Sequence, residues 1–363
     1  MFKALKKLGP RARRSALRAQ ITKDVLAEVT EHLYLDKVDA QGRPNLTRLN
    51  MALADLDAAH LNLKFFGYEL ARSLAAALPP NRETAARHVG LKSSASTQID
   101  MESDWVAHWC GQLNVPVVFH RKLWELSYVL QALYENGMMR EGARGLGFGC
   151  GQEPIPSYLA SHGVAVTITD LEPEDAAAAG WAQTNQHAAS LDQAFQPTML
   201  SRERFDELVD LRYVDMNAIP VDLTGYDFCW SICAFEHLGS IAKGLDFVEN
   251  SLRTLRPGGV SVHTTEFNIA ADGPTMDNWP TVLFQRGHFT EIAERLRAQG
   301  HEVAELDFDL GDKPMDRFID IPPWQHGMPP EVAHWHGDSL HLKIGLSGFT
   351  STCFGILVRK AMD

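Results

Sequence analysis

A glycine-rich stretch in the middle of the chain, GLGFGCGQEP, constrains the fold more than any other feature. It starts at Gly145 and leads through a helix-like segment into the β-type run VAVTITD, which ends at Asp170. A Rossmann-type α/β unit holds a nucleoside with a strand, a glycine turn, a helix and a second strand. The second strand ends in a carboxylate about twenty residues after the glycine turn. The spacing of the glycines indicates which nucleoside to expect.

That spacing is G-x-G-x-G, at Gly147, Gly149 and Gly151. A dinucleotide fingerprint requires G-x-G-x-x-G, and Gln152 occupies its last position here. A pyrophosphate would also meet Glu153 at the start of the next helix, where a carboxylate competes for the backbone N–H groups. Both observations disfavour a dinucleotide and favour a nucleoside without a pyrophosphate.

The hydrophobic pattern changes near residue 140. Before it, apolar residues recur every three or four positions, as in 50–78 and 120–138, which predicts helices. After it, β-type runs alternate with helical segments. We predict an all-helical accessory segment at 1–140 and, at 141–363, an α/β domain with a seven-stranded, doubly wound, Rossmann-like sheet and an antiparallel last strand. The expected strands are 142–149, 164–170, 211–216, 226–235, 260–267, 301–308 and 349–360.

The motifs from Gly145 to Lys360 resemble, in order and spacing, those of class I S-adenosylmethionine (SAM)-dependent methyltransferases. GFGCG is similar to the family's glycine turn, SICAFEHL to its fourth-strand segment, and LRPGG to the turn before its fifth strand. The resemblance implies SAM as cofactor, with Asp170 on the ribose hydroxyls and Asp215 and Met216 on adenine. The full implied set is Gly147, Phe148, Gly149, Gly151, Asp170, Leu171, Asp215, Met216 and Ser231. A cap at Asp170 and an Asx turn at Asp215 remain the structural alternatives.

One position departs from the family pattern. Its members usually carry an acidic residue two positions before the first glycine, where it supports the SAM amino group, and this chain has Gly145. The amino group then needs another partner. The candidates are a backbone carbonyl of Gly147, Glu153, and the helical segment, in which KLWEL at 122–126 lies shortly before the first strand.

Methyl transfer requires alignment of the acceptor and, for a hydroxyl, removal of a proton. Histidines near the carboxyl ends of the strands are the first candidates, because the pKa of histidine lies near neutrality. We predict His237, after the fourth strand, His263, within the fifth, and Glu266, at its end, as catalytic residues. A structural histidine at 237 and a solvent-exposed strand end at 266 are the alternatives.

The segment 311–345 is rich in Pro, His and Trp and is predicted to be a lid-like insertion over the acceptor. Its rings would stack on or hydrogen-bond a polar, ring-bearing acceptor such as a sugar. The candidate substrate residues are therefore Trp324, His334, Trp335 and His336. The histidines have neither cysteine partners nor a repeated spacing, so no metal site is predicted.

Charge and cysteine content limit the classes of binding partner and the cellular location that we expect. The net charge of −12 argues against a nucleic-acid partner. Every charged residue before Asp24 is basic, so this arm is a candidate contact with a partner or a membrane surface. No run approaches the roughly 18 apolar residues of a transmembrane segment. The five cysteines show no disulfide or zinc spacing, which predicts reduced thiols and a cytoplasmic location.

We therefore predict a SAM-dependent methyltransferase acting on a hydroxyl, or an amine, of a small molecule or glycan. The chain also resembles uncharacterised bacterial methyltransferases found among glycan-synthesis genes. A catalytically inert methyltransferase-like binding module is one alternative, but it predicts erosion of the glycine turn or of Asp170, and neither is eroded. An NAD(P)-dependent oxidoreductase is the other, and the glycine spacing disfavours it.

Overall fold

The structure is a computed structural model that describes residues 23–24, 46–79, 85–174, 187–324, 327–328 and 330–362. Most of the basic N-terminal arm therefore lies outside the described residues. By its contacts the chain separates into two units, Met1–Phe65 and Phe66–Asp363. The helices at 98–135 belong to the same unit as the sheet, while the domain boundary expected at residue 140 stays a prediction.

The helices begin where the sequence supplies caps. Ser103, Ser201 and Ser240 each accept a backbone N–H from the first turn of the helix that follows, and His120 accepts one from Lys122. The α-helices are α3 (Leu46–Ala76), α4 (Gln98–Met101), α5 (Asp104–Gln112), α6 (Arg121–Glu135), α7 (Ile155–Ser161), α9 (Arg202–Leu208), α10 (Ile241–Ser251), α11 (Arg286–Ala298), α12 (Pro314–Arg317) and α13 (Pro330–His336). Short 3-10 turns are η2 (Leu191–Ala194), η3 (Phe235–His237) and η4 (Leu252–Thr254).

Within the described residues, a nine-stranded sheet has the order β4-β3-β2-β5-β6-β11-β10-β9, and β7 also pairs with β11. Strands β2 to β6 run parallel, and β11 lies antiparallel to β6. The expected doubly wound, Rossmann-like fold with an antiparallel last strand is confirmed. The strands are β2 (Arg144–Phe148), β3 (Ala165–Asp170), β4 (Val209–Tyr213), β5 (Tyr226–Ile232), β6 (Leu255–Asn268), β7 (Glu302–Val303), β9 (Ile319–Asp320), β10 (Lys343–Leu346) and β11 (Phe349–Arg359), with β1 (Ser93–Ser94) and β8 (Leu306–Asp307) paired separately.

Three details differ from the expected strands. Strand β6 starts at Leu255, ahead of the expected turn, because the Pro-Gly-Gly sequence forms an irregularity in the pairing with β5 rather than a break. The expected strand at 301–308 is divided into the two short strands β7 and β8. The segment 311–345 adds β9 and β10 to the edge of the sheet and also carries α12 and α13. Its lid-like role stays a prediction.

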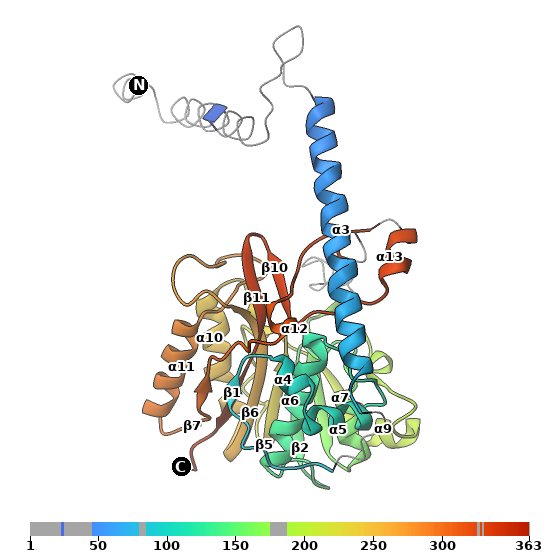
Figure 1. The fold of residues 1–363 in the computed structure, drawn as a ribbon. Coiled ribbons are helices and arrows are strands. Elements are labelled where there is room, and N and C mark those ends of the chain that lie inside the picture. Colours follow the sequence, from blue (N-terminus) through green and yellow to red (C-terminus); the bar gives the residue numbers. More distant parts are fainter. Residues whose placement is uncertain are drawn as a thin grey trace, which may run out of the picture. The chain divides into compact units, whose positions relative to one another are not determined.

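Helices cover both faces of the sheet: α10 and α11 lie on one side, and α5, α6 and α7 on the other (Figure 1). The central strand β5 alternates accordingly, with Phe228 and Trp230 in the core beneath α5–α7 and Cys229 in the opposite core. Both faces of the central strands are thus buried, which leaves the strand ends as the places for a site. In the described part of the chain, no helix has both the length and the apolar character needed to cross a membrane.

Candidate active site

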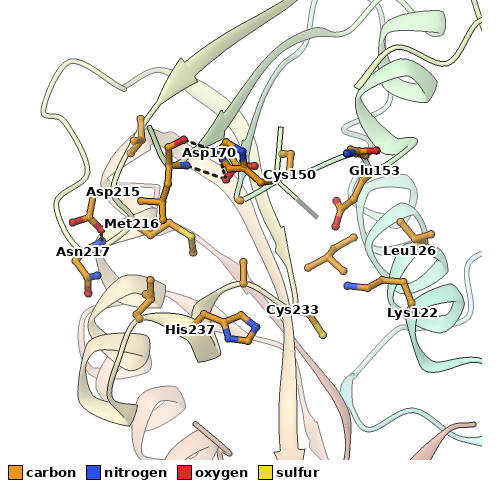
Figure 2. Close-up of a pocket in the computed structure, with 18 of the residues that line it drawn as sticks. Lys122, Leu126, Cys150, Glu153, Asp170, Asp215, Met216, Asn217, Cys233 and His237 are labelled. Carbon is orange, nitrogen blue, oxygen red and sulfur yellow. Dashed lines mark hydrogen bonds and ion pairs between the residues drawn. The ribbon is translucent and has the colours of Figure 1, made fainter. Parts of the chain in front are cut away.

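A cavity of about 460 Å³ opens at the carboxyl ends of β2, β3, β4 and β5, which is where ligands bind in open α/β sheets. Figure 2 shows residues of α6 and Glu153 on one side of it, and the residues that follow β4 on the other. The residues that line the cavity are Lys122, Leu126, Gly149, Cys150, Gln152, Glu153, Pro154, Asp170, Leu171, His187, Val214, Asp215, Met216, Asn217, Ile232, Cys233, Ala234, His237 and Leu238.

The glycine turn forms one wall of the cavity. Gly149 and Gly151 have φ values of +58° and +51°, a region that L residues with side chains rarely adopt. Gly147 precedes them, and a Cβ on it would lie 2.2 Å from the Cys150 sulfur and 2.5 Å from the Trp230 ring. The turn therefore requires its glycines, and the tight path brings the backbone of Gly149 to the cavity surface.

Asp170 ends β3 and holds the turn in place. Its carboxylate accepts the backbone N–H groups of Gly151, Leu171 and Ala188 at 3.1, 2.9 and 3.0 Å. Burial raises the pKa of Asp170, and these N–H groups act in the opposite direction because they favour the charged form. Since an ionised carboxylate has about four lone-pair sites, roughly one remains for a ligand in this geometry. The expected contact of Asp170 with both ribose hydroxyls would require one of these hydrogen bonds from the backbone to break.

The residues after β4 form the far end of the cavity. The Asp215 carboxylate accepts the backbone N–H of Asn217 at 2.8 Å, which is the Asx turn considered as its structural alternative. Asp215, Met216 and Asn217 all line the cavity nevertheless (Figure 2). Met216 packs close to the glycine turn, since its sulfur lies 3.6 Å from the position of a Cβ on Gly149. The thioether therefore offers an apolar surface beside a carboxylate, a combination that suits a purine ring with an exocyclic amine.

At the opposite end, the cavity is lined by a lysine and a carboxyl group. Lys122 projects from the first turn of α6, and Glu153 lies just after the glycine turn on the facing side (Figure 2).

 The Glu153 carboxyl has one oxygen, Oε2, that is buried without a hydrogen-bond partner. Burial raises the pKa of Glu153 from an ordinary value of 4.5 to about 8, and the charge of Lys122 acts against that rise. A buried carboxyl oxygen without a partner beside a cation is a ready acceptor for a ligand ammonium.

Residues 146–263 match the methyltransferase domain family. The match covers the glycine turn, Asp170 and the cavity segment after β5, and the strand order and the antiparallel β11 agree with it. Residues 146–263 therefore carry a SAM-dependent methyltransferase domain. The expected family and the expected cofactor are confirmed.

Solved structures that match the chain share little sequence with it. A SAM-dependent methyltransferase from Aquifex aeolicus is 15% identical, with 63% of this chain and 88% of that chain covered and a TM-score of 0.33. A TehB-like SAM-dependent methyltransferase from Corynebacterium glutamicum is 20% identical, with 63% and 86% covered and a TM-score of 0.32. The [4+2]-cyclase SpnF is 18% identical, with 75% and 98% covered and a TM-score of 0.42. TM-scores this low support nothing about the substrate. A comparison with curated proteins finds no match.

Of the three residues expected to act in catalysis by this methyltransferase, His237 lines the cavity. Its Nδ1 lies 3.1 Å from the carbonyl oxygen of Pro280 and 3.2 Å from the hydroxyl of Thr281, and its Nε2 lies 3.9 Å from Oε1 of Glu236. A proton on Nδ1 donated to the Pro280 carbonyl makes Nε2 the basic nitrogen. The imidazole is therefore held by its neighbours at the edge of the cavity.

Glu266 and His263, both on β6, differ in their surroundings. Glu266 pairs with Arg121 and accepts the Ser351 hydroxyl at 2.5 Å, so it is a buried, paired carboxylate and not a solvent-exposed strand end. His263 is fully buried in the core. Its Nδ1 lies 2.8 Å from the hydroxyl of Ser231, and serine hydroxyls also surround its Nε2.

The placement of His263 does not support a role as proton acceptor. Burial lowers the pKa of His263 to about 3, and the residue does not line the cavity. Ser231 points to this core histidine, and Phe148 packs edge-to-face on Phe247, so neither lines the cavity. The side chains of His263, Ser231 and Phe148 all belong to the interior of the sheet.

The four candidate substrate residues lie outside the cavity lining. Trp324 packs edge-to-face on His341, and Trp335 on α13 is 72% exposed. His336 is buried and packs edge-to-face on Tyr68, while His334 lies on α13. Their expected role in binding the acceptor stays a prediction.

Some polar residues of the site were not assigned by sequence reasoning. Arg121 comes from α6, just before the KLWEL segment, Cys233 follows β5, and His187 contacts Asp170, with its Nε2 3.7 Å from Oδ1. Cys233 has a φ of +45°, which is uncommon outside glycine. The signal for α6 was present, because its polar residues at 121, 122 and 125 interrupt an otherwise apolar helix face just before the first strand.

Proposed function

We propose that this methyltransferase binds SAM in the cavity and methylates a hydroxyl, or an amine, of a small molecule or glycan. The observation that carries the proposal is the unpartnered Glu153 carboxyl oxygen beside Lys122, at the opposite end of the cavity from Asp215 and Met216. An amino-acid zwitterion needs an anion and a cation side by side, and a purine needs a flat apolar surface. Lys122 supplies the cation, the ligand ammonium would favour the ionised form of Glu153 as it binds, and Met216 supplies the apolar surface at the other end.

In this proposal each end of the cavity has a defined role. Glu153 accepts the ammonium and Lys122 donates to the carboxylate of the methionine part. Asp170 accepts a ribose hydroxyl, and Asp215 and Met216 bind adenine, while Gly147, Gly149 and Gly151 give the backbone its close path. Leu171 contributes to the wall beside the ribose. Glu153 thus takes the place of the acidic residue that this chain lacks at Gly145.

The absence of an acid at position 145 has a packing reason. A Cβ on Gly145 would lie 2.5 Å from the ring of Phe228, which is fully buried on the neighbouring strand β5. A carboxylate there would have to displace an aromatic side chain from the core. The chain therefore needs an anion from another element, and Glu153 is the carboxyl that the turn delivers to the cavity.

When bound, SAM supplies a methyl group on a sulfonium that is already activated for displacement. The protein then has to hold the acceptor in line and accept its proton. His237 is the proposed base, because it lines the cavity and its Nδ1 contact orients the ring. Glu266, paired with Arg121, is proposed to act on the acceptor side of the cavity.

The acceptor class rests on charge. With a net charge of −12, the chain offers little to attract a polyanion, and the basic residues concentrate at the N-terminus. A small or glycan acceptor remains the best fit, and the N-terminal arm is proposed to contact a partner or a membrane surface. All five cysteines are free thiols, which agrees with the cytoplasmic location that we propose.

Isothermal titration calorimetry with S-adenosylhomocysteine, with NAD as a parallel ligand, tests the cofactor site. We expect micromolar binding of S-adenosylhomocysteine and none of NAD. Binding of NAD alone would revive the oxidoreductase alternative, and no binding of either would favour the inert-module alternative. A screen of hydroxylated and amine acceptors with radiolabelled methyl donor then tests the acceptor class, and transfer only to a nucleic acid would contradict it.

A further inference from the structure

A cluster of thiol and carboxyl groups lies beside the cavity, at the carboxyl ends of β5 and β6. Among the described residues, Cys233, Glu236 and Glu266 each offer one ligand atom, and these three atoms lie within 4.8 Å of one another. Glu236 and Glu266 are 1% and 5% exposed. A second group, formed by Glu125, Cys233 and Cys353, meets the same distance and shares the Cys233 sulfur.

One atom of this cluster is left without a partner. Glu236 accepts the Thr265 hydroxyl on Oε2 at 2.8 Å, but its Oε1 is buried with no hydrogen bond. A buried carboxylate oxygen without a donor is costly, and such atoms in native proteins usually await a ligand, an ion or a water. Nε2 of the His237 ring, on the cavity wall, lies 3.9 Å from this oxygen.

Around Cys233, acidic side chains outnumber basic ones. Three carboxyl groups and two cations meet here: Glu125, Glu236, Glu266, Arg121 and Lys122. With all of them ionised, the cluster has one excess negative charge in a largely buried place. A divalent ion bound with Cys233 as a thiolate would neutralise it, because the ion adds two positive charges and the thiolate one negative charge.

We propose that Cys233, Glu236 and Glu266 bind a divalent transition-metal ion, with zinc as the preferred ion. Cysteine thiolates and carboxylates are both zinc ligands, and three protein ligands leave a fourth position open. In a tetrahedral zinc site, ligand atoms lie roughly 3.5 Å apart, so small side-chain rotations would close the present spacing.

The neighbouring groups fit such a site. The Cys233 thiol already donates toward Glu125, with its sulfur 3.2 and 3.0 Å from the two carboxyl oxygens, so the thiol is oriented and polarised by a carboxylate outside the ligand set. Glu266 is held by Arg121 and by the Ser351 hydroxyl, and Glu236 by Thr265. Hydrogen bonds of this kind orient carboxylate ligands around metal ions.

The location of the site indicates what the ion would do in catalysis. This part of the inference rests on the proposed function. Cys233 lines the cavity, so the open position would face the acceptor (Figure 2). A hydroxyl oxygen bound there would lose its proton more readily, and His237 is placed to receive that proton. The resulting alkoxide is the stronger nucleophile for the methyl carbon. This role favours a hydroxyl over an amine as acceptor.

Metal binding can be measured on the full chain without knowledge of the acceptor. After treatment with a chelator, the protein is titrated with Co²⁺ and, separately, with Zn²⁺. We expect one ion per chain and a thiolate-to-cobalt charge-transfer band in the near ultraviolet. Cys233→Ser should abolish the band, and Glu236→Gln should weaken binding by at least about tenfold. Cys110→Ser, which changes a buried cysteine on α5 outside the cluster, should change neither.

Absence of the band, or a band that persists in Cys233→Ser, would overturn the proposal. Binding that is equal in wild type and Glu236→Gln would overturn it as well. The same preparations are titrated with S-adenosylhomocysteine and their thermal unfolding is recorded, which shows that the variants fold. If S-adenosylhomocysteine binds and the metal does not, the metal site alone fails. If the metal binds and S-adenosylhomocysteine does not, the proposed cofactor site fails and the metal site stands.

Discussion

The carboxylate of Asp170 accepts the backbone N–H of Gly151, 3.1 Å away. This bond ties the end of β3 to the glycine turn that follows β2, so the two features that identified the fold in the sequence also hold each other in place. The same carboxylate accepts N–H groups from Leu171 and Ala188. Asp170 is therefore a structural anchor of the cavity wall as well as the proposed ribose acceptor.

Asp170→Asn tests both roles. An amide replaces one acceptor oxygen with a donor, which opposes the N–H groups that now point to the carboxylate. We expect S-adenosylhomocysteine binding to weaken by about 2 kcal/mol, roughly 30-fold, because bonds to a charged group are lost. Calorimetric titration measures this. Asp210→Asn, at an exposed carboxylate on β4 that accepts the Thr167 hydroxyl, is the control and should bind as wild type does.

The proposed zwitterion site predicts a selective loss. Lys122→Met and Glu153→Gln should each weaken S-adenosylhomocysteine binding by about tenfold or more, since each removes a charge-assisted bond. Neither variant should weaken binding of methylthioadenosine, which has the nucleoside but lacks the amino-acid part. Lys92→Met, at a surface ion pair with Glu305, is the control. An equal loss for both ligands would place these two residues elsewhere than at the methionine end.

Gly145→Asp restores the acidic residue usual in the family, and we expect it to destabilise the protein. The new Cβ would lie 2.5 Å from the Phe228 ring, and overpacking of this kind typically costs about 1–3 kcal/mol. The melting temperature should fall by several degrees, without a gain in S-adenosylhomocysteine affinity. Gly111→Ala, a helix position with no atom within 4 Å of the new Cβ, should leave the melting temperature unchanged or higher. Tighter cofactor binding by Gly145→Asp would contradict the packing argument.

The sequence predicted what short-range patterns determine. The glycine turn and Asp170 lie about twenty residues apart in one strand–helix–strand unit, so their meeting follows from local structure. The central strands β2, β3 and β5 were equally clear because they are continuous apolar runs. The start of β6 was missed because Pro257 and two glycines normally end a strand, whereas here an irregular pairing with β5 accommodates them.

Features that depend on contacts between distant elements could not be predicted from the sequence. The metal cluster draws one residue each from the segments after β5, at η3 and at the end of β6, with α6 and β11 packed around it. Nothing in the local pattern of Cys233 or Glu236 indicates that they share a partner. His263 shows the converse, because its place on a strand suggested catalysis, yet the sheet turned it toward Ser231 and the core. Which face a strand residue takes depends on packing between distant elements.

The pKa of Glu153 predicts how stability depends on pH. The folded protein holds this proton up to about pH 8, whereas an unfolded chain releases it near the ordinary value of 4.5. Between these values the folded state binds more protons, so the stability due to the neutral carboxyl is fully present below 4.5 and is lost as the pH rises through about 8. The melting temperature of ligand-free wild type should therefore fall more steeply over this range than that of Glu153→Gln, whose side chain is always neutral. Glu172→Gln, at an exposed position, should follow the wild-type curve. Parallel curves for wild type and Glu153→Gln would show that the Glu153 carboxyl is already ionised in the folded protein.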